Sequence, residues 1–325
     1  MSAPKPLASV SLDVDDLWTY LRTHGDPAWE RHPSYLPTFV PRALELLDEL
    51  GLRITFFLVG FDAAQPHNQA LLRSIPERGH EVGNHTYAHE CWLHLYTPAQ
   101  LEQEVARAEE AIHLATGHRP AGFRGPGFSW CPALFDVLAR RGYRYDASTL
   151  PTFLGPLARL YFLATADLTA EERERRRALF GSFRDGLRPV HPYRWQLGGG
   201  RTLLEIPVTT MPVVKVPFHM SYLLYLSRFS KRLMTAYLRT ALAACRLMRV
   251  EPSFLLHPLD VLGADEAPAL AFFPGMELPV QHKLDACREA LRALGEHYEL
   301  VPMGAHANAI LARKELRLRE PALAT

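Results

Sequence analysis

The sequence predicts an α/β fold: a deformed or incomplete (β/α) barrel of about seven strand–helix units. Three observations lead to this prediction. Short apolar segments rich in β-forming residues alternate with helical patterns along most of the 325 residues. Helix start and stop residues separate these segments. Chemically reactive side chains recur where the expected strands end, and the strand ends of such a barrel meet on one face.

The first half of the chain alternates regularly. Strands are expected at 9–13, 53–59, 81–83, 122–124 and 143–147. Helices are expected at 40–50, 68–78, 98–115 and 132–141. Pro41 suits a first helical turn and Gly51 a helix end, while Thr97 with Gln100 forms a capping box for the third helix.

The alternation breaks at 150–200, a segment rich in Arg, Pro and Gly, in which the charged run 171–177 is interpreted as a solvated helix face. It then resumes. Further elements are expected as strands 203–208, 253–256 and 298–301 and as helices within 221–248, at 281–296 and near 304–318. The interpretation is one catalytic domain over 8–310 with an insert at 150–200, followed by 311–325 as the end of the last helix and a tail.

Composition excludes several classes of protein. Hydrophobic residues make up 48% and charged residues 22%, which is typical of a globular protein and argues against a disordered, collagen-like or coiled-coil chain. Basic and acidic residues number 36 and 35, which gives a net charge of +1. No overall field attracts the protein to nucleic acid, so no nucleic-acid partner is expected.

The cysteines and the apolar stretches bear on the compartment. The four cysteines lie far apart without a C-x-x-C pair, which argues against a zinc ribbon, a thioredoxin-like motif and a disulfide scaffold. No apolar run follows the first lysine, and the stretches 213–226 and 233–248 contain charged residues, short of the ~18–20 clean residues that a membrane span needs. We expect a soluble, cytoplasmic protein without a transmembrane segment.

The first chemical candidate is the acidic group Asp13, Asp15 and Asp16 at the end of a strand. Three carboxylates in four residues repel one another unless a cation or an arginine neutralises them. Asp13 and Asp15 share one face of an extended strand. The alternative interpretation is a solvated loop with an aspartate that caps a helix.

The second candidate is the pair His85 and His89, which at spacing i, i+4 would lie on one side of a helical turn and could bind one metal. The chain has 15 histidines, so such a spacing also arises by chance. Glu90 follows the second histidine instead of the first, which argues against a zincin protease. With one carboxylate the pair would form a face suited to Zn²⁺ or another divalent transition metal.

Two further candidates follow later strands. Arg124 precedes a Gly/Pro loop, and such an arrangement can hold a carboxylate and offer backbone N–H groups, although alone it reads as a turn. His257 ends a buried strand, a position where a lone histidine is more often structural.

Together the four candidates resemble the polysaccharide deacetylase family with the NodB-homology fold, carbohydrate esterase family 4. Residues 11–15 (SLDVD) are similar to its D-x-D branch, in place of the usual T-F-D-D-G. Residues 79–89 (GHEVGNHTYAH) are similar to the motif G-H-E-[IVL]-G-x-H-[ST]-x-x-H. Residues 123–126 (FRGP) and 255–258 (LLHP) resemble the R-x-P and L-x-L-H motifs. The resemblance covers 8–148 closely and 201–305 more loosely.

The resemblance implies a role for each residue. Asp15, His85 and His89 would hold one divalent metal, with zinc favoured over cobalt, nickel, manganese or iron. Asp13 would be the base that activates the attacking water, with Arg124 holding it charged and oriented. In addition, the backbone N–H of Gly127 would help to hold the oxyanion, and His257 would protonate the leaving amine.

The sequence departs from the family pattern in two places. Gly127 stands where relatives carry an aromatic residue, for which Phe128 or Trp130 would compensate. The family's D-x-x-D-W motif is not evident, so either Asp146 or Asp260 would tune His257. In the first motif, Asp16 is the alternative to Asp15 as a metal ligand.

The function implied is a metal-dependent deacylase, an N-deacetylase or a deformylase, that acts on an N-acylated amino sugar in a glycan, glycoconjugate or lipid-linked sugar. A metal-independent, allantoinase-like C–N hydrolase and a catalytically degenerate carbohydrate-binding protein are the alternatives. The insert, with Phe128 and Trp130, is expected to line the mouth of the site. The apolar stretch 213–226 with Arg228, Lys231 and Arg232 would suit a peripheral membrane contact, and the competing interpretation is an ordinary buried helix with a solvated end. The oligomeric state stays open.

Overall fold

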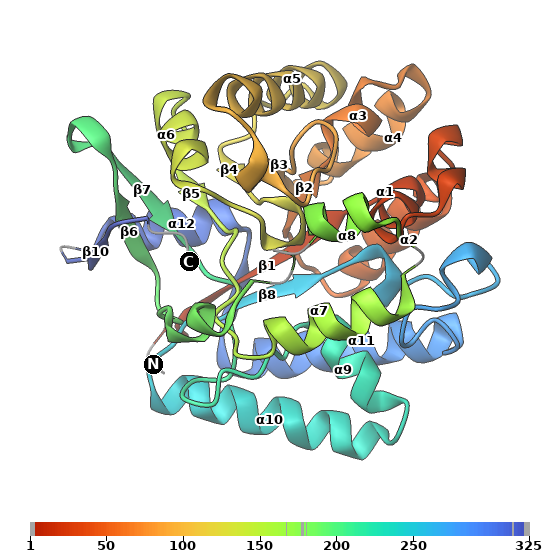
Figure 1. Cartoon of the computed structure of the whole chain (residues 1–325). Helices are drawn as coiled ribbons and strands as arrows, with labels where there is room; N and C mark the ends of the chain where they lie inside the picture. Colours follow the sequence, from red (N-terminus) through yellow and green to blue (C-terminus); the bar gives the residue numbers. More distant parts are fainter. Residues whose placement is uncertain (1–3, 167, 177–178, 180, 314, 322–325) are drawn as a thin grey trace.

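A computed structural model of the chain describes residues 4–166, 168–176, 179, 181–313 and 315–321. One sheet runs through the centre and helices surround it (Figure 1). Its strands are β1 (Leu7–Val14), β2 (Thr55–Leu58), β3 (Glu81–Asn84), β4 (Gly122–Phe123), β5 (Tyr145–Asp146), β6 (Tyr193–Gln196), β7 (Thr202–Glu205), β8 (Ser253–Leu256), β9 (Glu299–Val301) and β10 (Leu318–Arg319).

The sheet is an incomplete barrel. Its strand order is β10-β6-β7-β5-β4-β3-β2-β1-β8, and β9 pairs with β1. Neighbouring strands are parallel except β6 and β7, which are antiparallel. Among the described residues no ladder joins β7 to β8, although the Thr209 N–H donates to the Ser253 carbonyl at 3.0 Å just beyond β7. The predicted fold class is confirmed.

The helices lie outside this sheet, except α12. They are α1 (Leu17–His24), α2 (Leu36–Glu49), α3 (Gly60–Ala64), α4 (Pro66–Glu77), α5 (Pro98–Thr116), α6 (Pro132–Arg140), α7 (Gly155–Thr165), α8 (Ala170–Arg175), α9 (Met220–Ser227), α10 (Lys231–Leu247), α11 (Val280–His297) and α12 (Met303–Leu311). The capping box predicted for α5 is present, with the Gln100 N–H bonded to the Thr97 side chain. Gly117 ends the same helix with φ 78°, a left-handed conformation that glycine adopts readily.

Three predicted helices have different limits. The helix expected at 40–50 begins at Leu36, so Pro41 lies inside it instead of in its first turn. The long helix expected within 221–248 is two helices, because the side chain of Ser230 accepts from the Leu233 N–H and starts α10 afresh. The terminal helix ends at Leu311, and 318–319 pair with β6 as β10.

The two faces of β1 explain how the strand positions the site. Its even-numbered residues from Ala8 to Val14 are buried in the main hydrophobic core. The odd-numbered residues Ser9, Ser11 and Asp13 face the barrel interior, where they contact buried polar side chains. This alternation is what the pleat of a strand requires. α12 fills the interior below them, with Met303, Ala307 and Ile310 packed against residues of β2, β5 and β7.

The part of the segment 150–200 that contains α7 and α8 packs on the face where the strands end, whereas β6 joins the edge of the sheet. Phe162 and Leu168 join a buried cluster with Cys91 and Trp92, which follow β3. Arg176 donates to the carbonyls of Thr23 and Arg22 at 2.8 Å each, at the end of the helix that follows β1. In Figure 1, α7 and α8 accordingly cross in front of the central strands.

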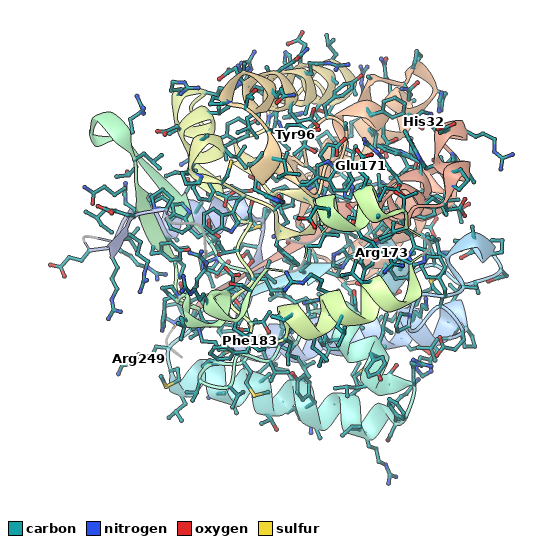
Figure 2. The ribbon with its side chains drawn as sticks, in the orientation of Figure 1. His32, Tyr96, Glu171, Arg173, Phe183 and Arg249 are labelled. Carbon is teal, nitrogen blue, oxygen red and sulfur yellow. The ribbon has the colours of Figure 1, made fainter. Side chains whose placement is uncertain are left out.

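Side chains of the charged run 171–177 are mostly solvated, as expected. Glu171, Arg173 and Glu174 are exposed, and Figure 2 shows Glu171 and Arg173 on α8 in front of the sheet. Arg176 is the buried exception, and Arg177 lies outside the described residues.

Over the part of the chain that the structure describes, no helix is both long and apolar enough to cross a membrane. The four cysteines are buried free thiols.

Candidate metal centre and active site

Three donor atoms converge at the ends of β1 and β3. The Nε2 atoms of His85 and His89 each lie 3.1 Å from Oδ1 of Asp15. All three side chains are buried, and one ligand atom from each falls within 4.8 Å of the others. One carboxylate oxygen and two imidazole nitrogens form a donor set that suits zinc and similar divalent metals.

A loop, not a helical turn, brings the two histidines together, so the predicted local geometry is wrong. Thr86 and His89 have φ of 63° and 53°, which no helix accommodates. The Asn84 side chain accepts from the Thr86 N–H at 2.8 Å, and the Gly60 N–H donates to the Thr86 carbonyl at 2.8 Å. These bonds hold a strained loop of the kind that clusters at functional sites.

A backbone contact on the side away from the donor cluster fixes the orientation of the His85 ring. Its Nδ1 lies 2.7 Å from the backbone carbonyl of Arg124, which can only accept, so Nδ1 carries the proton. Nε2, which faces Asp15, is therefore the ring atom left either to bind a metal or to form a hydrogen bond with this carboxylate. Such a carbonyl contact is the usual support of a metal-binding histidine.

The electrostatics of the cluster favour positive charge. Burial alone would raise the pKa of Asp15, but the charge of His89 and the hydrogen bonds of both histidines hold it well below its usual value. Burial alone would lower the pKa of His89, but the charge and hydrogen bond of Asp15 outweigh burial and raise it to about 10. The favoured cation in the metal-free site is the protonated His89 ring beside the Asp15 carboxylate, and a metal would bind by displacing that proton.

Asp13 is paired with Arg124 beside the cluster. Nη1 of the fully buried Arg124 donates to Oδ1 of Asp13 at 2.6 Å and to Oγ of Ser11 at 2.9 Å. Its Nε donates to the Ala147 carbonyl at 3.1 Å, and its guanidinium lies 4.4 Å from the centre of the Phe57 ring. The other oxygen of Asp13, Oδ2, lies 4.0 Å from Nε2 of His85, so this carboxylate faces the donor cluster.

Asp16, the alternative ligand, has a structural role. Its Oδ1 accepts from the N–H of Leu17 at 2.7 Å and of Tyr35 at 3.0 Å, and it caps α1. Burial is the main reason that the pKa of Asp16 rises to about 6. The described donor cluster does not include it.

His257 stands at the end of β8, next to Asp13. Leu12 pairs with Leu256 in parallel strands, so Asp13 and His257 are the next residues along two neighbouring strands. The backbones of such strands lie about 5 Å apart. Nδ1 of His257 lies 3.2 Å from the Ser221 hydroxyl, which donates to Oδ1 of Asp260 at 2.9 Å. The other Asp260 oxygen accepts the His257 backbone N–H at 2.8 Å.

Of the two acids considered as partners of His257, Asp260 is therefore the one that reaches it. Asp146 bonds instead to the N–H and hydroxyl of Ser148, at 3.1 and 2.7 Å. It is fully buried between Ser148 and the acid Glu205, and burial raises its pKa.

Besides Ser221, sequence reasoning missed His219 and Tyr20 beside the site. The His219 ring lies 5.9 Å from that of His257, and its buried Nδ1 has no partner among the described residues. Burial first, then the charges of His257 and Arg124, lower its pKa to about 3, so His219 is neutral. Burial and the nearby charges of Asp15 and Asp260 raise the pKa of Tyr20 on α1. No motif in the apolar stretch around His219 indicated a functional residue. The one sequence feature that could have indicated Tyr20 is its position one helical turn after Asp16, the residue that caps α1.

The loop after β4 was expected to place Phe128 and Trp130 at the mouth of the site, and the structure differs from this for Trp130. Gly127 is exposed, with φ 57°, and a Cβ built on it would lie 3.5 Å from Cys91, which is ordinary contact. Trp130 does not line the mouth of the site, because its ring is buried and stacks on Phe135 at 5.2 Å. Phe128 is half-buried beside Gly127.

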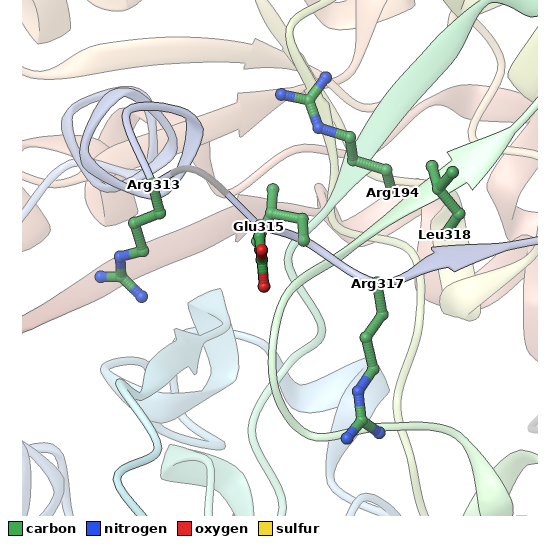
Figure 3. Close-up of a pocket in the computed structure, with 6 residues that line it drawn as sticks. Arg194, Arg313, Glu315, Arg317 and Leu318 are labelled. Carbon is green, nitrogen blue, oxygen red and sulfur yellow. The ribbon is translucent and has the colours of Figure 1, made fainter.

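A separate hollow of about 650 Å³ lies at the surface by β6 and β10 (Figure 3). Its lining is Arg194, Arg313, Glu315, Leu316, Arg317 and Leu318. It contains none of the donor residues, so the candidate site is elsewhere.

Comparison with known proteins agrees with this geometry. Residues 4–145 match the family described as polysaccharide deacetylase. The peptidoglycan deacetylase of Helicobacter pylori is 29% identical over 172 residues, which cover 51% of this chain and 55% of that protein. A chitooligosaccharide deacetylase of a Bradyrhizobium species is 33% identical over 135 residues, covering 39% and 59%. The chain thus matches about half the length of these curated relatives.

Two solved structures share the fold over nearly the whole chain. A candidate polysaccharide deacetylase from Mycobacterium smegmatis has a TM-score of 0.62 at 22% identity, covering 100% of this chain and 96% of that one. The allantoinase Puue has a TM-score of 0.58 at 16% identity, covering 96% and 95%. These similarities concern the fold alone.

Proposed function

Because residues 4–145 belong to the polysaccharide deacetylase family, we propose that this protein is a metal-dependent deacylase that hydrolyses the amide of an N-acylated amino sugar. The observation that carries the proposal is the placement of Asp15, His85 and His89 around one point, with the Asp13–Arg124 pair beside it. In this proposal one catalytic domain spans 8–310.

The residues present fit a divalent cation. The two Nε2 atoms and Oδ1 of Asp15 face one another, and the Arg124 carbonyl holds the tautomer of His85 that a metal ligand needs. Three protein ligands leave positions open, which is the pattern of catalytic zinc sites. When bound, such a cation polarises a carbonyl and makes water a stronger acid near neutral pH. Zinc is the favoured metal, with cobalt, nickel, manganese or iron as substitutes.

Asp13 takes the proton from the attacking water in this mechanism. The water oxygen forms a bond to the amide carbon as the proton passes to the carboxylate. Arg124 is a positioning residue: its short bond to Oδ1 fixes the orientation of Asp13, while Oδ2 stays directed to the cluster. The backbone N–H of Gly127 is proposed to share the charge that develops on the carbonyl oxygen.

His257 protonates the leaving nitrogen. The C–N bond then breaks, and the products are a free amine and a carboxylic acid, acetate or formate. Ser221 and Asp260 fix the ring, because the hydroxyl that donates to Asp260 accepts from Nδ1 and leaves Nε2 for the substrate.

The proposal is tested by release of acetate and formate from a panel of N-acetylated and N-formylated amino sugars, free, polymeric and lipid-linked. Chelated protein should be inactive, and added Zn²⁺ should restore release. Full activity after chelation would favour metal-independent hydrolysis, and no release from any member with metal would favour a binding protein. In the same assay Asp16→Asn should stay active, since asparagine caps helices as well as aspartate does. It is the control for the loss of a carboxylate next to the donor cluster.

A further inference from the structure

The segment 206–250 has a one-sided charge that the proposed active site does not use. It contains no aspartate and no glutamate, in a chain whose net charge is only +1. Its basic residues are Lys215, Arg228, Lys231, Arg232, Arg239, Arg246 and Arg249. This segment forms α9 and α10, which pack on each other, and α10 lies along one edge of the molecule in Figure 1.

The outward stripe of α10 alternates arginine and alanine. Arg232, Ala236, Arg239, Ala243 and Arg246 are all exposed and recur at helical spacing. The opposite stripe, which includes Met234, Leu238 and Leu242, is buried against the core. None of the three stripe arginines forms an ion pair with a carboxylate of the described residues, and Figure 2 shows Arg249 at the rim of the molecule beyond the helix end.

Large apolar side chains border this stripe in the open. Phe229 is 69% exposed, Leu233 47% and Leu247 83%. α9 repeats the pattern: Met220, Leu223 and Leu224 are buried on one side, and Tyr225 is 44% exposed on the other. Exposed apolar side chains rimmed by bases are typical of an interaction surface.

A small hairpin next to α10 presents two more apolar residues. The Tyr237 hydroxyl donates to the Pro217 carbonyl at 2.7 Å, and the Met211 N–H donates to the Val216 carbonyl at 2.8 Å. At the tip of this hairpin Val213 is 75% exposed and Val214 54% exposed. Val213 has φ 72°, a strained conformation for a β-branched residue. The fold holds this valine in solvent.

We propose that the surface formed by α9, α10 and the 211–217 hairpin docks on an anionic phospholipid membrane. Exposed bases with no acid in the segment attract an anionic membrane surface, and the exposed aromatic and leucine side chains among them can insert between its lipids. The positive charge of this surface is complementary to phospholipid phosphates. The exposed apolar residues favour a bilayer over nucleic acid as the partner, because a bilayer offers an apolar interior. Acidic neighbours are few: Glu277 pairs with Arg228, and Glu289 accepts from Thr235.

The docking surface is joined to the proposed active site. Ser221, which contacts His257, lies in the first turn of α9, and Tyr225 follows one turn later. Membrane docking would therefore hold the site close to the lipid headgroups, where a lipid-linked sugar would be presented. The docking itself does not depend on the proposed deacylase activity.

Vesicle co-sedimentation tests this proposal on the whole chain. The protein should bind vesicles of phosphatidylcholine mixed with phosphatidylglycerol, but not of phosphatidylcholine alone, and salt should weaken binding. R232Q/R239Q/R246Q should lower the partition coefficient by roughly 100-fold, because each base near an anionic surface contributes about fivefold. Phe229→Ser should lower it by roughly tenfold with charge unchanged.

The matched control R78Q/R140Q/R201Q removes the same charge from exposed positions on other elements and should bind like the wild type. Circular dichroism and release from a soluble N-acetyl sugar confirm folding, and both triple variants should leave them unchanged. The proposal is overturned if the wild type does not bind anionic vesicles at low salt. Equal loss in both triple variants, or binding to duplex DNA in place of vesicles, would overturn it as well.

Discussion

Asp13 lies near the end of β1 and Asp15 directly follows that strand, yet their neighbours give them different surroundings. Asp15 faces two imidazoles, whereas Asp13 is bonded to a buried guanidinium. Arg124 donates to Oδ1 of Asp13, which leaves Oδ2 of that carboxylate to accept a proton. This difference supports assigning the ligand role to Asp15 and the base role to Asp13.

Asp13→Asn should therefore keep the metal and lose turnover by roughly 10²–10⁴-fold, the usual contribution of a general base. The amide can still accept a hydrogen bond from Arg124 but cannot take a proton. Metal content and kcat with an N-acetylated amino sugar are the two measurements. Near-normal kcat in this variant would mean that another carboxylate is the base.

His219 predicts a pH dependence of stability. Its pKa is lowered to about 3 in the folded protein, mainly by burial, while an unfolded histidine has a value of about 6.5. Between these two values the histidine of the unfolded chain binds a proton that His219 of the folded protein does not bind. This group therefore costs no stability above about pH 6.5, and the free energy of unfolding falls as the pH drops below that value.

For the metal-free protein the free energy of unfolding should lose about 1.4 kcal/mol per pH unit below pH 6.5 through this one group. The His219→Asn variant should lose this part of the pH dependence. The control variant His118→Asn, at an exposed histidine, should retain it. Urea unfolding above and below pH 6.5 measures the slope. An identical slope in wild type and His219→Asn would show that this ring protonates freely in the folded state.

At the scale of elements, the sequence predicted strands better than loops. Dense apolar runs placed β2 and β8 within two residues of their limits, because burial on both faces leaves little choice of residue. The loop that carries His85 and His89 was misread as helical, because its positive φ values depend on bonds from Asn84 and Gly60 that no spacing reveals. Ser221 was missed for a similar reason, since its contact with His257 spans distant segments.

The insert helix α7 carries a prediction about selectivity. Phe162 anchors it, buried with Trp92 and 5.9 Å from the His24 ring. Phe162→Ala should loosen α7 and change KM or substrate preference, while metal content stays constant, since no described residue of the insert belongs to the donor cluster. Leu114→Ala, which trims an exposed leucine on α5, is the control. Unchanged preference across the sugar panel would instead assign the insert a role remote from substrate.

At the scale of the whole molecule, the barrel explains why distant motifs share one site. Parallel strands end on one face, so residues that follow β1, β3, β4 and β8 meet there although more than 240 positions separate the first from the last. Sequence order and strand ends therefore predicted which residues gather. Burial of Trp130 and His219 could not be predicted, because it depends on packing between segments that the motifs do not include.

The central claim is that Asp15, His85 and His89 together hold one divalent cation. Metal content per chain, measured after loading with Zn²⁺ and removal of the excess, tests it most directly. The wild type should retain one equivalent and His89→Ala should lose most of it, because two donors do not make a zinc site. His94→Ala, a histidine outside the cluster, should retain the full equivalent. A full equivalent of zinc in His89→Ala would contradict the account.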